Sequence, residues 1–194
     1  MKKGITLLFF PLAVLLSLNS CGPTVDDRNK MIVSVRDQKL LLLCDGQPVK
    51  AYQISTSKFG VGDIPNSNRT PLGRMKVAKK IGAGEPAGAV FKSRRPTGEV
   101  IKPNAPGRDP IISRILWLTG TQSANRNAFR RFIYIHGTPE HNRLGTPASY
   151  GCIRMGSKDV VDLYNRVGAG ADVYVIRGSL RKDPAIERRF TAAR

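Results

Sequence analysis

The stretch Ile135-His136-Gly137-Thr138, followed by Ser149-Tyr150-Gly151-Cys152-Ile153-Arg154-Met155, is the most informative part of this chain. It brings an imidazole and a thiol close together in a sequence that holds only two histidines and three cysteines. A thiolate is the reactive form of cysteine, and a neighbouring imidazole can take the thiol proton. His136 and Cys152 are therefore the candidate catalytic pair.

Residue alternation predicts how these two side chains are presented. Residues 131–136 have the composition of a strand that places His136 on the face opposite Ile133 and Ile135. If residues 152–155 are extended, Cys152 and Arg154 share one side. Strand ends lying side by side would bring the imidazole and the thiol within hydrogen-bonding reach.

The turn before the cysteine offers backbone donors. Glycine permits a sharp approach of the chain to a reacting carbonyl, and backbone N–H groups can stabilise the developing oxyanion. The expected donors are the N–H groups of Gly151, Cys152 and Tyr150.

The remaining pattern indicates a mostly β domain with one short helix. The expected strands are residues 31–36, 39–44, 49–55, 74–78, 111–119 and 172–177, with a hairpin turn at Asp45-Gly46. A helix begins near Ser157 and ends at Gly168, because apolar side chains recur at helical spacing at Val160, Leu163, Tyr164 and Val167. Residues 57–74 are expected to be loop. Residues 82–110 are rich in Gly and Pro and are expected to form an irregular insertion or lid, with short strands at 89–92 and 99–102.

The N-terminus has the pattern of an export signal. Lys2 and Lys3 precede an apolar run over residues 5–18, which is shorter than the roughly 20 residues that span a membrane. Leu18-Asn19-Ser20-Cys21 resembles a bacterial lipobox, which predicts lipidation at Cys21; ordinary cleavage near Ser20 is the alternative. We expect a signal peptide over 1–20, a tether over 21–29, a catalytic domain over 30–177 and a basic, polar, mobile tail over 178–194. The protein is then exported to the periplasm and held at a membrane.

Composition narrows the partners. The formal net charge of +18 implies anionic partners such as nucleic acid, acidic lipids or envelope polymers, and export argues against nucleic acid.

Cys44 ends an apolar run and is expected to be a buried small side chain, although a disulfide with Cys152 is conceivable. No Cys-x-x-Cys motif suggests disulfide exchange. Glu140 and His141 are the only further ligand types just after His136, so no metal is expected, and His141 should be a solvated loop residue.

Taken together, Ile135–Thr138, Leu144-Gly145 and Ser149–Met155 strongly resemble the L,D-transpeptidase catalytic domain. The similarity extends to the early hairpins, to Ile54-Ser55-Thr56-Ser57 leading into Thr70-Pro71-Leu72-Gly73, and to the last helix and strand. The resemblance implies a β-sandwich-like fold with one short helix after the catalytic cysteine. It also implies acyl transfer on peptidoglycan stem peptides without a cofactor.

Carried onto this sequence, the resemblance assigns a role to several residues. Cys152 is the nucleophile and His136 the base, with the ring oriented by a backbone carbonyl, that of Gly137. Arg154 would bind substrate or order the cysteine loop, and Ser149 and Tyr134 are further expected substrate contacts. Many relatives carry His in place of Tyr150, so this site must work with one motif histidine.

Two other readings stay open at this stage. Water could replace the acceptor amine, which would make the protein an L,D-carboxypeptidase or an amidase that detaches wall-linked proteins. Alternatively, the protein could be a non-catalytic lipoprotein that binds the envelope through its basic surface.

Overall fold

The protein's structure, a computed structural model, describes residues 25–182. The predicted signal peptide, the lipidation candidate Cys21 and the tail beyond Lys182 lie outside these residues. Within the described part of the chain, no helix is long and apolar enough to cross a membrane.

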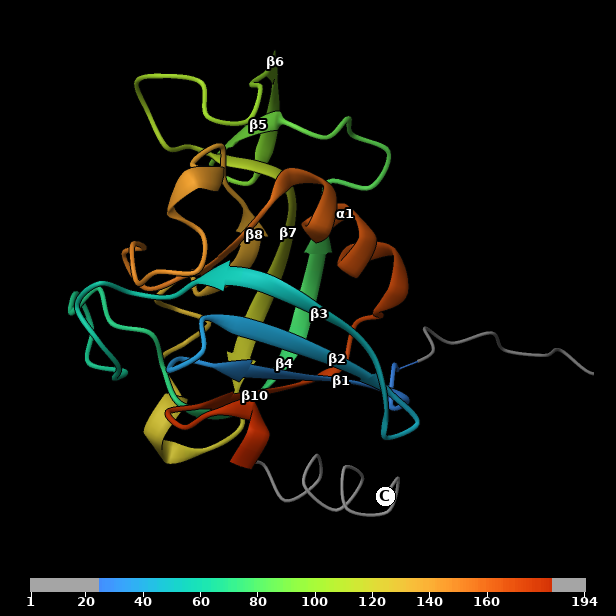
Figure 1. The fold of residues 1–194 in the computed structure, drawn as a ribbon, viewed down its shortest axis with the longest axis vertical. Helices are drawn as coiled ribbons and strands as arrows, with labels where there is room; N and C mark the ends of the chain where they lie inside the picture. Colours follow the sequence, from blue (N-terminus) through green and yellow to red (C-terminus); the bar gives the residue numbers. More distant parts are fainter. Residues whose placement is uncertain (1–24, 183–194) are drawn as a thin grey trace, which may run out of the picture.

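The ten strands of the described region form one sheet that closes on itself. Their order is β4-β10-β1-β2-β3-β9-β8-β7-β5-β6, and β4 also pairs with β7. The strands are β1 Asn29–Ser34, β2 Lys39–Cys44, β3 Gln47–Ser55, β4 Gly73–Ile81, β5 Ala89–Lys92, β6 Arg95–Val100, β7 Ile111–Gly120, β8 Tyr134–Gly137, β9 Ile153–Met155 and β10 Asp172–Ile176. In Figure 1, β1, β2 and β3 lie across β4, β7 and β8, while the β5–β6 hairpin projects from the end of β7. The mainly β, sandwich-like fold predicted from the sequence is confirmed.

Four short helical segments complete the fold of residues 25–182. They are α1 Ser157–Arg166 and three 3-10 turns, η1 Ser123–Asn125, η2 His141–Arg143 and η3 Leu180–Lys182. The helix α1 packs on β7 and β8 through Val160, Leu163 and Tyr164. The helix α1 therefore supports the strand that carries His136.

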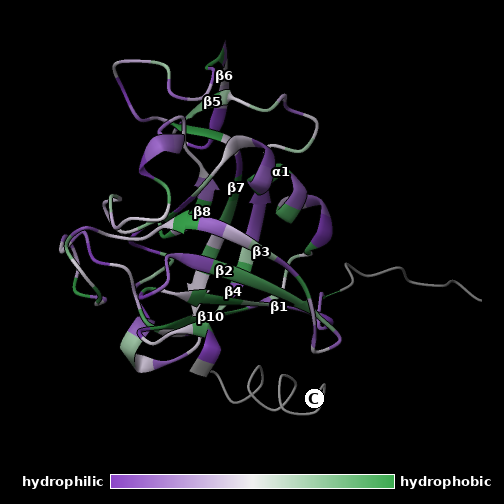
Figure 2. Cartoon of the chain, in the orientation of Figure 1, coloured by the Kyte–Doolittle hydropathy of each residue, from purple (hydrophilic) through white to green (hydrophobic). Residues whose placement is uncertain are grey.

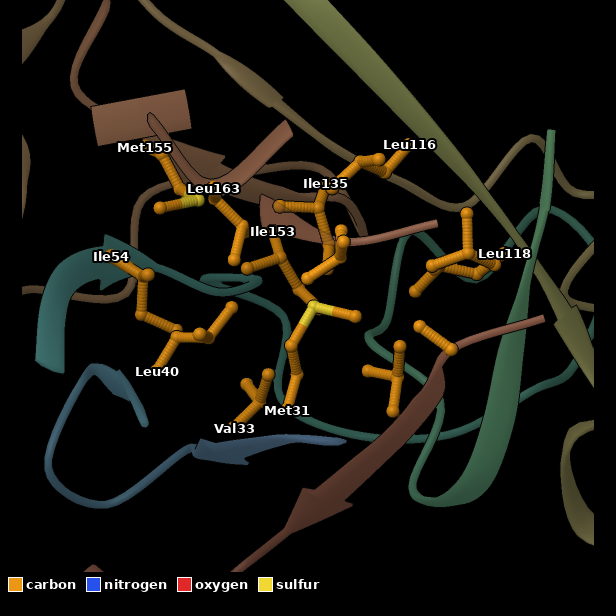
Figure 3. Packing of buried hydrophobic residues seen from close by; sticks show 14 of the residues in the cluster. Met31, Val33, Leu40, Ile54, Leu116, Leu118, Ile135, Ile153, Met155 and Leu163 are labelled. Atoms are coloured by element: carbon orange, nitrogen blue, oxygen red, sulfur yellow. The ribbon is translucent and has the colours of Figure 1, made fainter. Parts of the chain in front are cut away.

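The core fills the space enclosed by the closed sheet. Apolar residues that alternate along the strands are buried. Figure 2 shows hydrophobic (green) and hydrophilic (purple) bands along the same strands. Figure 3 shows Met31, Leu40, Ile135, Ile153 and Met155 packed together, and each is fully buried. Burying such a side chain stabilises the fold by about 1.5–3 kcal/mol. The strands of the motif are thus held from the core side.

Most predicted elements are present, with shifted ends. The strands 39–44 and 89–92 and the helix start at Ser157 are confirmed. The second strand of the insertion runs over Arg95–Val100 rather than 99–102. The strand expected from residue 131 begins only at Tyr134, because Phe132 has φ 55° and cannot continue an extended chain.

Two further expectations are corrected. Cys44 is half-buried rather than buried, because it is the last residue of β2, and it is a free thiol. The tail does not leave the domain at residue 178: the Ser34 hydroxyl donates to the Gly178 carbonyl at 2.6 Å, and the Leu180 N–H donates to the Asp37 carboxylate at 2.7 Å. Residues 178–182 therefore pack against the first strand.

Candidate active site

The two halves of the sequence motif lie on neighbouring parallel strands. In the pairing of β8 with β9, Ile135 is opposite Ile153 and His136 is opposite Arg154. Cys152 directly precedes β9, and its thiol packs with the apolar cluster that contains Tyr134. The register thus places the imidazole beside the guanidinium and the thiol beside the phenol.

His136 is held in one tautomer. Its Nδ1 lies 2.8 Å from the Gly137 carbonyl oxygen. Because a carbonyl only accepts hydrogen bonds, Nδ1 carries the proton and Nε2 keeps its lone pair. The side chain is 6% exposed, and burial lowers the pKa of His136 to about 4. The ring is therefore neutral at pH 7 and offers Nε2 as a base.

Gly137 is required by space. A β-carbon at this position would lie 2.6 Å from the Ile112 carbonyl oxygen and 3.1 Å from Val160. Since that oxygen belongs to the backbone, a larger residue would push β8 away from β7. The close approach fixes the carbonyl that orients His136.

Cys152 rests as a neutral thiol. Its Sγ donates to the Phe132 carbonyl at 3.3 Å, and burial raises the pKa of Cys152 to about 11. The hydrogen bond to His136 expected from the sequence is not formed among the described residues. The register explains why, because the thiol is level with Tyr134, two residues or roughly 6.5 Å along the strand from His136.

The cysteine loop is ordered by Ser149. The Gly151 N–H donates to the Ser149 hydroxyl at 3.2 Å, and that hydroxyl donates to the Cys152 carbonyl at 2.5 Å. Ser149 is 2% exposed, so its hydrogen bonds serve the loop. Gly151 has φ 119°, which favours glycine. Because the Gly151 N–H already donates to Ser149, two of the three expected oxyanion donors are left, the N–H groups of Tyr150 and Cys152.

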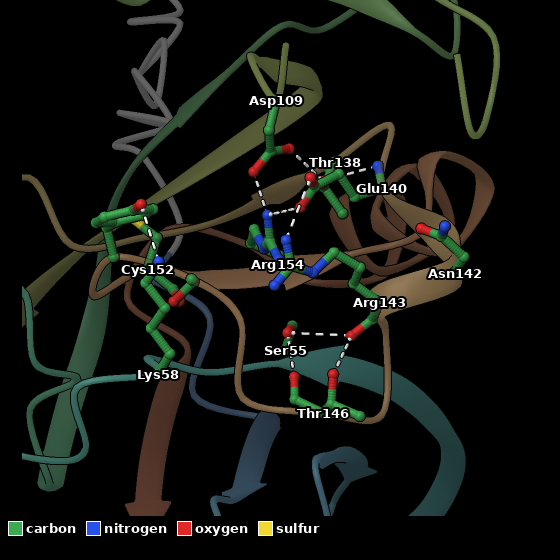
Figure 4. Close-up of polar contacts among 12 residues, drawn as sticks. Ser55, Lys58, Asp109, Thr138, Glu140, Asn142, Arg143, Thr146, Cys152 and Arg154 are labelled. Carbon is green, nitrogen blue, oxygen red and sulfur yellow. Dashed lines mark hydrogen bonds and ion pairs between the residues drawn. The ribbon is translucent and has the colours of Figure 1, made fainter. Parts of the chain in front are cut away.

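Arg154 lies inside an ion-pair network that the sequence did not predict. Its side chain is 3% exposed, and its Nη1 contacts Asp109 and, at 2.8 Å, Glu140. Asp109 also accepts a hydrogen bond from the Thr138 hydroxyl. Figure 4 shows the guanidinium between the two carboxylates. Arg154 thus joins the end of the insertion to the loop after β8.

The network surrounds His136 with charge. Asp109 acts to raise the pKa of His136 and Arg154 acts to lower it, while burial has the largest effect. Two nitrogen atoms of Arg154, Nε and Nη2, have no hydrogen-bond partner within residues 25–182. No sequence pattern predicted that Asp109 and Glu140 pair with Arg154, because 45 and 14 positions separate them from it.

Tyr150 forms the exposed rim of the site. It is 64% exposed, and the Lys58 Nζ lies 2.9 Å from its hydroxyl and 4.3 Å from its ring centroid. The hydrogen bond from Lys58 lowers the pKa of Tyr150. A cavity of about 430 Å³ opens here, and its lining includes Cys152, Tyr150, Phe132, Asn68 and Arg130. The thiol is therefore reachable from solvent.

Tyr134, an expected substrate contact, lies in an aromatic cluster. It is 4% exposed and meets Trp117 edge-on at 5.5 Å between centroids. Trp117 in turn stacks on Phe129 at 4.2 Å. Burial raises the pKa of Tyr134, and the neighbouring Arg94 opposes that shift. The phenol therefore forms part of the floor beside the thiol.

His141 has a structural contact instead of being a solvated loop residue. It is half-buried, and its Nε2 accepts the Ser157 N–H at 3.0 Å. This bond satisfies a free N–H in the first turn of α1, where Gly156 offers no side chain. Residues 25–182 contain no group of three or more His, Cys, Asp or Glu side chains that could hold a metal ion.

The closed β-sheet carries a histidine on β8 and a cysteine directly before the adjacent parallel strand β9, and these features define the class of domain. Residues 28–175 match the YkuD family, the L,D-transpeptidase catalytic domain. The chain belongs to this family.

Solved structures share the fold. The chain is similar to L,D-transpeptidase 3 from Mycobacterium tuberculosis, with 18% identity and a TM-score of 0.51, over 77% of this chain and 61% of that one. The same enzyme in complex with a faropenem-derived adduct gives 20% identity and a TM-score of 0.50, over 76% and 60% of the two chains. An L,D-transpeptidase from Xylanimonas cellulosilytica gives 18% identity and a TM-score of 0.50, over 79% and 63%.

This chain spans less than two thirds of the length of these solved chains. A comparison with curated protein sequences gave no match.

Proposed function

We propose that the protein is a cysteine-dependent L,D-transpeptidase of peptidoglycan stem peptides. The thiol of Cys152 attacks the carbonyl of the third stem residue, and the proton of the thiol passes to Nε2 of His136. The bond to the terminal D-alanine breaks, and that amine takes the proton as it leaves. An amine of a second stem then attacks the thioester. The new amide bond replaces the C–S bond, and the proton of the amine passes through Nε2 of His136 to the sulfur of Cys152, which restores the thiol and completes the cross-link.

One observation carries this proposal. The Gly137 carbonyl holds Nδ1 of His136, which leaves Nε2 free as a base on the strand next to Cys152. A neutral imidazole is the form that can accept a proton, and burial keeps it neutral. The thiol must leave the Phe132 carbonyl before it transfers its proton, so acylation begins with a movement of the Cys152 side chain.

The cellular setting is part of the same proposal. The signal pattern over residues 1–20 and the lipobox-like Cys21 support export and a lipid anchor on the periplasmic side. The net charge of +18 supports contact with anionic envelope polymers. Loss of membrane association in Cys21→Ala, with intact enzyme activity, would test the anchor.

Purified tetrapeptide stems test the reaction. The wild type should yield cross-linked dimers together with free D-alanine, and Cys152→Ala should yield neither. Cys44→Ala is the matched control, since Cys44 is a half-buried free thiol outside the site, and it should keep full activity. Only tripeptide in place of dimers would show that water is the acceptor. Absence of a covalent carbapenem adduct on wild-type Cys152 would favour the non-catalytic reading.

A further inference from the structure

The tip of the β5–β6 hairpin has an unusual residue in its turn. Lys92 pairs with Arg95, which leaves Ser93 and Arg94 as a two-residue turn. Both have positive φ, 50° and 66°. Hairpin turns with two positive φ values strongly favour Asn-Gly or Asp-Gly, and other residues adopt this conformation uncommonly. The chain thus places a large cation where the backbone favours glycine.

The Arg94 side chain is held against aromatic rings. Its guanidinium carbon lies 5.1 Å from the Trp117 ring centroid and 5.2 Å from that of Phe132. Arginine packs well on such ring faces. Arg94 is half-buried, and it forms no ion pair with any carboxylate of residues 25–182. The buried Arg131 and Arg154 differ, because each is paired with Asp63 or Asp109.

Arg94 and the thiol share the same neighbours. The Cys152 Sγ donates to the Phe132 carbonyl, and Cys152 packs with the cluster of Trp117 and Tyr134. Arg94 lies over the rings of Trp117 and Phe132, and its charge acts to lower the pKa of the Tyr134 hydroxyl. A positive charge without an acidic partner therefore faces the floor of the site from the insertion.

We propose that Arg94 is a substrate-binding residue that pairs with a carboxylate of the acyl donor beside the bond that Cys152 attacks. A guanidinium binds a carboxylate through two parallel N–H···O bonds, which gives both affinity and orientation. The inference rests on the proposed function for the identity of the substrate. The carboxylate belongs either to the side chain of the third stem residue or to the departing D-alanine.

Arg94→Gly is the sharpest variant. Glycine suits a φ of 66°, so the hairpin should fold at least as well without the side chain. Arg95→Gln is the matched control, because Arg95 is the next residue and is exposed. Each protein is assayed with three tetrapeptides: the free acid, one amidated on the third-residue side chain, and one ending in D-alanine amide.

We expect Arg94→Gly to lower kcat/KM about tenfold to a hundredfold for the free acid, the size of a lost hydrogen bond to a charged group. The loss should disappear for one of the two amidated peptides, which identifies the carboxylate. Equal losses on all three peptides would overturn the inference, as would the same loss in Arg95→Gln.

A second measurement does not depend on the peptide substrate. The Cys152 thiolate displaces iodide from iodoacetate or from neutral iodoacetamide, forming a C–S bond, and mass spectrometry reads the rate at Cys152 alone. The ratio of the two rates should fall severalfold in Arg94→Gly and stay unchanged in Arg95→Gln. An unchanged ratio in Arg94→Gly would overturn the inference. If the wild type reacts faster with iodoacetate than Arg94→Gly does, relative to iodoacetamide, but makes no peptide dimers, the proposed function fails and the carboxylate site stands.

Discussion

The floor of the site, with His136 and Cys152, and the insertion above it, residues 82–110, differ in the charge of their key side chains. On the floor, burial favours the neutral forms of both reactive groups, with the pKa of His136 at about 4 and that of Cys152 at about 11. The insertion presents charge instead, through Arg94 at its tip and Asp109 at its end. The comparison teaches that the proposed chemistry and the proposed recognition of the substrate lie on separate parts of the chain.

The largest effect is expected on kcat/KM, from a substitution on the floor of the site. His136→Gln removes the proposed base while keeping a polar side chain, and kcat/KM should fall by about 10²–10⁴, the usual contribution of a general base. His141→Gln is the matched control at the other histidine: activity per folded molecule should be retained, because His141 only caps α1. Equal activity losses in the two variants would contradict a special role for His136.

The resting thiol should react slowly. With a pKa raised to about 11, Cys152 at pH 8 is thiolate in roughly one molecule in a thousand, against about one in four for a free cysteine of pKa 8.5. The rate of iodoacetamide alkylation at Cys152 should therefore keep rising with pH well above 9. The urea-unfolded chain, followed at the same peptide by mass spectrometry, supplies the reference. A rate that is already constant at pH 8 would show a preformed thiolate.

The smallest effect is expected on the free energy of unfolding, at the ion pair between Arg154 and Asp109 that links the floor to the insertion. Asp109→Asn removes one carboxylate from the buried Arg154, and Glu140 remains at 2.8 Å. We expect the free energy of unfolding to fall by about 1–3 kcal/mol, because a buried charge loses part of its partner. Glu99→Gln breaks the exposed Arg108–Glu99 pair in the same insertion and should cost less than about 1 kcal/mol. Urea unfolding measures both. Equal costs would mean that burial of Arg154 does not matter.

The parts of the fold that follow local rules could be predicted. The strand over 39–44 and the helix from Ser157 were evident from apolar spacing, since each buries one face of a regular element. The prediction that His136 turns toward its own strand's Gly137 carbonyl came from the family resemblance and agrees with the 2.8 Å contact.

The parts of the fold that depend on contacts between distant residues could not be predicted from the sequence. Nothing local marks Asp109 as a partner of Arg154, because the two meet only once β7 and β9 have taken their places on either side of β8. The start of β8 was misplaced because Phe132 looks like a strand residue yet adopts φ 55°. The Ser93–Arg94 turn lacks the Asn-Gly signal, so the strand after it was expected too late in the chain.

The way the insertion is attached has an evolutionary consequence. The β5–β6 hairpin joins the closed sheet through only two residue pairs, Val90 with Ile112 and Phe91 with Ile111. β8, by contrast, pairs with β7 along its whole length and with β9 over residues 135–137. Mutations can therefore lengthen, shorten or recharge the hairpin while β8 and β9 keep their positions, so that the proposed recognition of a substrate can change without any change in the proposed reaction centre.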